Sequence, residues 1–167
     1  MLPLSPSASA AERRATATRV VVVPSDGGPV QHAFGERVQC KLSGAQTGGT
    51  LALGLHTLPP GEGQPERCLA GDAVCIVVSG RLEILVDDAW LPAEPGAVAF
   101  LPRGVRHAVR NVGDAPSQHW MLTTPSGFEL FFDACADAFE DAAATGSAPD
   151  MARLLALAAE YRVALHL

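Results

Sequence analysis

The sequence is poor in charge and lacks both long apolar runs and paired cysteines. Charged residues make up 18% of its 167 residues, whereas apolar residues make up 48%, so a mostly disordered chain is excluded. No apolar run approaches the roughly 20 residues that span a bilayer. The net charge of −6 argues against nucleic acid and against an anionic membrane surface as partners.

The cysteines form no Cys-x-x-Cys pair and lie far apart, at Cys40, Cys68, Cys75 and Cys135. Disulfide frameworks are typical of small secreted chains, so we expect reduced thiols and a cytoplasmic protein. Residues 1–18 are rich in alanine and serine but contain no continuous hydrophobic stretch. We therefore expect a flexible N-terminal tail and not a secretory signal.

From Arg19 to Thr124 the chain alternates short apolar segments with Gly, Pro, Asp and Asn turns. The pattern predicts eight strands: 20–23, 36–42, 50–58, 73–78, 81–86, 97–101, 107–111 and 118–123. Many short strands at spacings of about 8–12 residues, without intervening helices, indicate an antiparallel sandwich or barrel.

The last forty residues have helical periodicity instead. Apolar side chains recur at intervals of three and four, first in Phe128, Phe131, Phe132, Cys135 and Phe139 and then in Met151, Leu154, Leu155, Ala158 and Tyr161. This spacing predicts two amphipathic helices packed on the outside or across one end of the β unit, and then an edge strand at 163–165. The chain divides into a tail (1–18), a β domain (19–125) and a helical extension (126–167).

A motif near the middle runs from Gly96 to Asn111 with the sequence GAVAFLPRGVRHAVRN. It resembles the second motif of the cupin superfamily, G-x5-P-x-G-x2-H-x3-N, at every fixed position. Segments 42–49, 58–63, 124–132 and 149–161 also look like the small cupins related to quercetin dioxygenase. The resemblance implies an all-β fold, a cupin jelly-roll barrel with one small-molecule cavity, and a homodimer. It also implies that His107 points into the barrel.

The first cupin motif, G-x5-H-x-H-x3,4-E-x6-G, is degraded here. Gly80 marks its end, and counting back places Ala73 at the glutamate and Glu66 and Cys68 at the two histidines. Only His107 remains of the four metal ligands that the resemblance implies, so we expect no cofactor. The alternative is a divalent metal (Zn, Fe, Mn or Ni) held by His107, Glu66 and Cys68, because imidazole, carboxylate and thiolate all bind such metals.

Side-chain alternation predicts what else lines the barrel, since residues two apart on a strand share a face. Cys75 and Val77 share the face of Ala73, and Val109 shares that of His107. His56 faces either the cavity or solvent, and the face of His119 stays open. The expected cavity residues are Cys68, Ala73, Cys75, Val77, His56, Phe100 and Val109.

Three functions remain open. The first is an enzyme without a redox metal that binds a small, fairly apolar metabolite, as in secondary metabolism. There His107, helped by Glu66, would transfer protons in an isomerisation, cyclisation, dehydration or decarboxylation, because imidazole titrates near neutrality. The second is a quercetin-dioxygenase-like enzyme with altered ligands. The third is a non-catalytic module that binds a small ligand.

Overall fold

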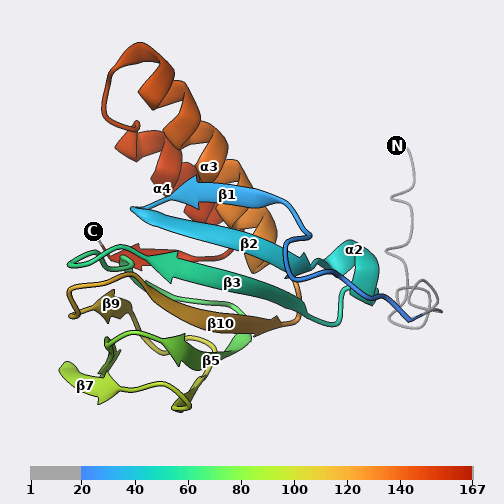
Figure 1. Ribbon diagram of the computed structural model, residues 1–167. Helices are drawn as coiled ribbons and strands as arrows, with labels where there is room; N and C mark the ends of the chain where they lie inside the picture. Colours follow the sequence, from blue (N-terminus) through green and yellow to red (C-terminus); the bar gives the residue numbers. More distant parts are fainter. Residues whose placement is uncertain (1–19, 167) are drawn as a thin grey trace.

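The computed structural model describes residues 20–166 (Figure 1). Its strands are β1 (Val30–Ala33), β2 (Glu36–Leu42), β3 (Ala52–Leu58), β4 (Glu66–Cys68), β5 (Asp72–Ser79), β6 (Leu82–Val86), β7 (Ala89–Ala93), β8 (Val98–Leu101), β9 (Val109–Asn111), β10 (Ser117–Thr124) and β11 (Ala164–His166). Its helices are α2 (Gly44–Thr47), α3 (Phe128–Thr145) and α4 (Met151–Glu160).

The strands form two antiparallel layers. The larger sheet has the order β1-β2-β3-β10-β5-β8, and the other layer contains β7-β6-β9 and the pair β11-β4. Single bridges from Gly63 to Arg110 and from Arg67 to His107 connect the β4 region to the β9 region. The interior of the jelly roll lies between these layers, and inward-facing apolar residues of both layers form one core.

Helix α3 adds aromatic residues to that core. Phe131 and Phe132 are 1% and 2% exposed, and Cys135 is fully buried. The three positions recur at helical spacing, so one face of α3 packs against the β unit. In Figure 1, α3 and α4 lie beside the β1–β2 hairpin, away from β7. Gly146 ends α3 in the left-handed conformation (φ 65°), which glycine adopts without steric cost.

The predicted jelly roll with two C-terminal helices is confirmed. The structure differs in detail, because residues 20–23 are not part of a sheet and β1, β4 and β7 were not predicted. β7 follows from Asp87 and Asp88, whose positive φ values of 47° and 67° make a tight hairpin with β6. The predicted tail at 1–18 lies outside the described residues. Within residues 20–166, no helix is long and apolar enough to cross a membrane.

Candidate functional site

A cluster of buried polar side chains lies inside the jelly roll. Glu36 comes from β2, His56 from β3, His119 from β10, and Gln64 and Arg67 from the segment that contains β4. Each of the five is at most 5% exposed. Buried polar groups are costly unless they bond to one another, so the contacts within this cluster decide what it can do.

The Glu36 carboxylate is the centre of the cluster. Its Oε2 atom lies 2.8 Å from Nδ1 of His56 and accepts a hydrogen bond of 2.8 Å from the amide of Gln64. Its other oxygen, Oε1, is buried without a partner. One oxygen is therefore fixed by two donors, while the other keeps its full capacity to accept.

Gln64 connects this carboxylate to a cation. Its Nε2 atom lies 3.5 Å from Nε2 of His119, and its Oε1 accepts a 2.8 Å hydrogen bond from the Arg67 guanidinium. His119 stacks on His56 with ring centroids 5.1 Å apart. The amide thus holds Glu36 and Arg67 in one network although the two charged groups do not touch.

The two buried charges stabilise each other. Burial alone would raise the pKa of Glu36, but His56, the positive Arg67 and the Gln64 hydrogen bond outweigh it and lower this pKa. Burial lowers the pKa of Arg67, and the negative Glu36 opposes that shift. Because guanidinium stays protonated at any physiological pH, the interior holds an anion and a cation that offset each other.

His107 is the neutral member of the interior. Its Nδ1 donates to the Val105 carbonyl at 3.0 Å, which leaves Nε2 as an acceptor, and that atom is buried without a partner. Burial, with help from the neighbouring Arg67, lowers the pKa of His107 to about 4. Burial likewise lowers the pKa of His119 to about 3. Both rings are therefore uncharged at neutral pH.

Aromatic side chains of helix α3 pack against one side of the cluster. The Phe132 ring meets His56 edge-on with centroids 6.0 Å apart, and the Arg67 guanidinium lies 5.0 Å from the centre of the Phe128 ring. A cavity of only about 20 Å³ remains between these aromatic rings and His56. Gly54 leaves room there, because a Cβ at that position would approach Nε2 of His56 to 3.2 Å.

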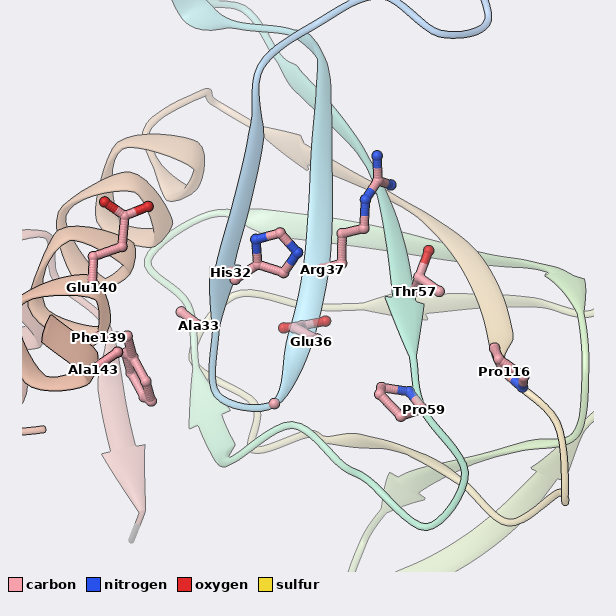
Figure 2. A pocket seen from close by; sticks show the side chains of 11 residues that line it. His32, Ala33, Glu36, Arg37, Thr57, Pro59, Pro116, Phe139, Glu140 and Ala143 are labelled. Carbon is pink, nitrogen blue, oxygen red and sulfur yellow. The ribbon is translucent and has the colours of Figure 1, made fainter. Parts of the chain in front are cut away.

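A larger cavity of about 580 Å³ opens beside the cluster (Figure 2). Figure 2 shows it spanning the β1–β2 hairpin, with α3 on one side and the ends of β3 and β10 on the other. Phe139 of α3, Pro59 and Pro116 make its apolar walls, and His32 and Arg37 contribute polar groups. Glu36 is the one residue of the cluster that lines this cavity.

The structure places the sequence-predicted residues in two groups. Ala73, Cys75, Val77 and Val109 are buried in the core at 2% exposure or less, as are His107 and His56 at 2% and 3%. Phe100 is 63% exposed on the outer face, so its assignment to the cavity is wrong.

Glu66 and Cys68 also lie away from the interior. Glu66 forms a 2.6 Å ion pair with Arg106, and the Cys68 thiol lies 3.8 Å from His166. Between them in sequence, Arg67 is buried. The predicted trio of Glu66, Cys68 and His107 is therefore not brought together, and neither the catalytic role of Glu66 nor this metal set survives.

The physical reason is a shift of one residue. The first motif allows three or four residues between its second histidine and its glutamate, and three residues place Arg67 and Leu69 at the histidine positions. Arg67 and Leu69 are 2% and 5% exposed, as inward-facing residues should be. Side chains alternate along a strand, so a spacing of four residues assigns the two histidine positions to Glu66 and Cys68, whose side chains lie on the outer face of β4.

The sequence reasoning missed Glu36, Gln64 and Arg67 and left His119 unassigned. Glu36 and His56 do carry a signal, since each occupies the same strand face as buried apolar neighbours, Val38 and Leu58. A charged residue in an inward register position is a candidate functional group. Gln64 and Arg67 had no such signal, because β4 is only three residues long.

The residues do not fit a metal ion. At the positions implied by the first motif, Arg67, Leu69 and Ala73 offer no anionic or imidazole donor. A different trio, Glu36, His56 and His119, has donor atoms within 4.8 Å of one another. However, the Gln64 Nε2 atom lies among them, at 2.8, 3.4 and 3.5 Å from their donor atoms. With Arg67 bonded to the same amide, a divalent ion would add charge to an interior that already holds a cation.

The central part of the chain matches a known protein family. Residues 54–122, from within β3 to within β10, match the family described as "Cupin domain". The chain carries a cupin domain. The finer subtype, the quercetin-dioxygenase-like cupins, stays a prediction.

Solved structures share the cupin fold at low sequence identity. A predicted oxalate decarboxylase of Thermotoga maritima has a TM-score of 0.59 at 16% identity, covering 63% of this chain and 99% of that one. A sugar phosphate isomerase of Silicibacter pomeroyi has a TM-score of 0.57 at 20% identity, and the match covers 64% of this chain and 77% of that one. The polyketide cyclase RemF of Streptomyces resistomycificus has a TM-score of 0.58 at 13% identity, and the match covers 65% of this chain and 81% of that one. These likenesses establish the fold alone.

One curated protein is similar in sequence. The "Endoribonuclease YbeY" of Myxococcus xanthus is 31% identical over 94 residues, which are 55% of this chain. This chain spans only 32% of the length of that protein. Most of the protein that bears the ribonuclease name therefore has no counterpart in this chain.

Proposed function

We propose that this cupin is a small-molecule enzyme that transfers protons without a metal ion, with Glu36 as the general base and His56 as its partner. One observation carries the proposal. A buried carboxylate has one oxygen fixed by His56 and Gln64 and the other without a partner, and the residue that carries it, Glu36, lines a 580 Å³ cavity.

The contacts support a defined proton path. Oε1 of Glu36 would remove a proton from a carbon next to a carbonyl group, and the C–H electron pair would pass to the carbonyl oxygen as an enolate forms. The lowered pKa keeps Glu36 ionised before the reaction, and the imidazole 2.8 Å away stabilises the carboxylate. With a β,γ-unsaturated ketone, return of the proton from Glu36 to the γ-carbon completes an isomerisation. With a β-hydroxy ketone, the enolate re-forms the carbonyl and expels the hydroxyl group, which takes the proton from Glu36 and leaves as water.

The cavity supports a small, fairly apolar substrate. Its volume of about 580 Å³ lies within the range of roughly 300–1,000 Å³ typical of ligand sites. Phe139, Pro59 and Pro116 offer apolar contacts, and the Oε1 atom of Glu36 lies buried behind this wall. A substrate reaches that atom when the hairpin and α3 move apart. The names of the cupin neighbours, which include a cyclase and an isomerase, agree with this class of reaction.

Deuterium exchange tests the proposal. Protein treated with EDTA is incubated in D₂O with a panel of apolar cyclic ketones, and incorporation at the carbon next to the carbonyl is followed by NMR. We expect exchange above the buffer rate in the wild type and at least a tenfold loss in Glu36→Gln and His56→Gln. Glu66→Gln, an outward carboxylate, is the matched control and should keep the wild-type rate. Loss in the control, or full exchange in Glu36→Gln, would refute the assignment.

A non-catalytic ligand-binding module is the second candidate, and one observation favours it. Phe131 and Phe132 fill the barrel interior, and only about 20 Å³ remains free next to His56. In that case ketones of the same panel would raise the melting temperature of the wild type without any deuterium exchange.

A further inference from the structure

Two buried atoms of the polar cluster lack a hydrogen-bond partner and are opposite in kind. Oε1 of Glu36 is an acceptor on an anion, and Nε of Arg67 is a donor on a cation. Both residues are only 2% exposed. Buried polar atoms are nearly always paired, because an unpaired one is costly. An unpaired acceptor and an unpaired donor in one network point to a ligand that can offer a proton to the first and an oxygen atom to the second.

The side chain of Gln64 shows how one group can bridge these two residues. Its Nε2 donates to Oε2 of Glu36 at 2.8 Å, and its Oε1 accepts from Nη2 of Arg67 at 2.8 Å. The bridging fragment is the planar unit H–N–C=O. An enolisable ketone contains the equivalent unit H–C–C=O, in which one bond is longer by about 0.2 Å. Gln64 therefore makes the same two contacts that such a ketone would make with a base and with a cation.

Proton transfer to Glu36 leaves a negative charge on the carbonyl oxygen of the substrate, and a fixed donor aimed at such an oxygen lowers the barrier strongly. Three side-chain nitrogens are buried without a partner in the described part of the chain. Nε2 of His107 is an acceptor, because Nδ1 of the same ring donates to Val105. The His119 ring is neutral, because burial lowers its pKa to about 3. Nε of Arg67 is the charged donor among the three, and charged donors bind anions about twice as strongly as neutral ones.

We propose that Arg67 binds the enolate oxygen of the substrate, a role that rests on the proposed function of Glu36 as the base. Oε1 of Glu36 takes the proton from the carbon, and the C–H electron pair forms the C=C bond of the enolate. The π pair of the carbonyl group moves onto its oxygen. That oxygen accepts a hydrogen bond from Nε–H of Arg67, and the guanidinium keeps its proton throughout.

Helix α3 covers both ends of this arrangement. The Phe128 ring lies 5.0 Å from the Arg67 guanidinium, and the Phe132 ring meets His56, the partner of Glu36, at a centroid distance of 6.0 Å. The two phenylalanines are four residues apart and so lie on successive turns of one helix face. Movement of α3, which a substrate needs in order to reach Glu36, would therefore uncover the base and the cation together.

Binding of a stable enolate tests the inference without turnover and without a variant. The probe is 1,3-cyclohexanedione, an apolar cyclic compound that is an enolate at pH 8. Its binding to ¹⁵N-labelled wild type is followed through the Nε–H resonance of Arg67, which is assigned by its NOE to the Phe128 ring. We expect a saturable shift of that resonance. The Nε–H of Arg110 is the internal control and should not shift, because it already donates to Glu83 at 2.9 Å.

Variants then separate charge from geometry. Arg67→Lys keeps the positive charge but removes the Nε–H donor, so it should bind the enolate at least tenfold more weakly than the wild type. Arg110→Lys is the matched control, since Arg110 also lies over an aromatic ring, Trp90, at 4.0 Å, and it should bind as the wild type does. Glu36→Gln resembles the base after it has taken the proton, so it should bind the enolate at least tenfold more tightly.

The outcomes distinguish the role of Arg67 from that of Glu36. An Nε–H resonance of Arg67 that does not shift with the enolate would overturn the inference. Equal enolate affinity in the wild type and in Arg67→Lys would do the same. An enolate bound through Arg67, in a protein that exchanges no deuterium into any ketone, would support the oxyanion site and contradict the base.

Discussion

At the scale of single residues, Arg67 has the largest effect on the interior. It points inward on β4, bonds to Gln64 and places a fixed positive charge near Glu36 and His107. Together with the stronger effect of His56, the charge lowers the pKa of Glu36, and it adds to the effect of burial in lowering the pKa of His107. One buried side chain therefore acts on two other members of the interior, and its charge also disfavours a metal ion in the same volume.

Removing one buried charge should destabilise the fold strongly. Arg67→Met leaves the buried Glu36 carboxylate without its cation, so we expect a loss of about 3–5 kcal/mol of unfolding free energy, and a similar loss for Glu36→Gln. The double variant should lose clearly less than the sum of the two, because neither charge is then left alone. Urea unfolding measures all three.

Arg153→Met is the control for this cycle. Arg153 pairs with Asp141 at the surface, where the Arg153 side chain is 44% exposed and the Asp141 side chain is 71% exposed. Such pairs contribute about 0–1 kcal/mol. Strict additivity of Arg67→Met and Glu36→Gln would contradict the coupled network.

The buried histidines should make stability depend on pH. His107 has a pKa of about 4 in the folded protein against 6.5 ordinarily, so between these values the unfolded chain binds a proton that the folded chain does not. Unfolding free energy therefore falls as pH falls from 6.5 towards 4, by about 1.4 kcal/mol per unit for this residue.

The test compares urea unfolding of the wild type and His107→Leu at pH 7, 6 and 5. The variant should show a shallower slope, with the remainder due to His119, whose pKa of about 3 acts in the same direction. Equal slopes in the two proteins would show that His107 is not buried in the neutral form.

At the scale of elements, α3 decides how much room the jelly roll has. Its Phe132 occupies space next to His56, and its C-terminal half forms one wall of the 580 Å³ cavity. The helix thus both fills the interior and shapes the adjoining pocket. A substrate-sized opening at His56 would require α3 to move.

Truncation of Phe132 should test that role. Phe132→Ala should lose about 3–5 kcal/mol, because a buried ring leaves a cavity that the neighbours fill only in part. Leu130→Ala, on the exposed side of the same helix at 53% exposure, should change unfolding free energy by less than about 1 kcal/mol. Similar losses in both variants would contradict the packing described for α3.

Sequence periodicity located the helices and most strands because their patterns extend over many residues. The spacing of Phe128, Phe131 and Phe132 is sufficient to define the buried face of α3. The prediction for β4 was wrong for the opposite reason. A strand of three residues is too short to show a period, and the first cupin motif allows two spacings that differ by one residue. His119 could not be assigned because its inward position depends on the pairing of β10 with β3 and β5, which no local pattern records.

At the scale of the whole molecule, the cupin fold is present, whereas three of the four metal-ligand positions that the resemblance implies hold other residues. The resemblance placed His107 in the interior, where it is buried, but the other ligand positions hold Arg67, Leu69 and Ala73. Arg67 instead joins the polar cluster through its bond to Gln64. Fold and site therefore separate in this chain, as they do across many folds.

Metal analysis checks this reading of the whole protein. We expect less than about 0.1 equivalent of zinc, iron, manganese or nickel after purification, because Gln64 and Arg67 occupy and charge the site. Addition of zinc should raise the melting temperature equally little in the wild type and in His119→Ala. One tightly bound equivalent that is lost in His119→Ala would refute the metal-free interior.

The pairing of β11 with β4 has a consequence for biosynthesis. His166 lies opposite Glu66 across that ladder, about a hundred residues away in sequence. During translation, β4 lacks this neighbour until residue 166 has left the ribosome, although its backbone bonds to His107 can form earlier. Closure of the β11–β4 ladder is therefore among the late steps of assembly, after most of the sheets are already available.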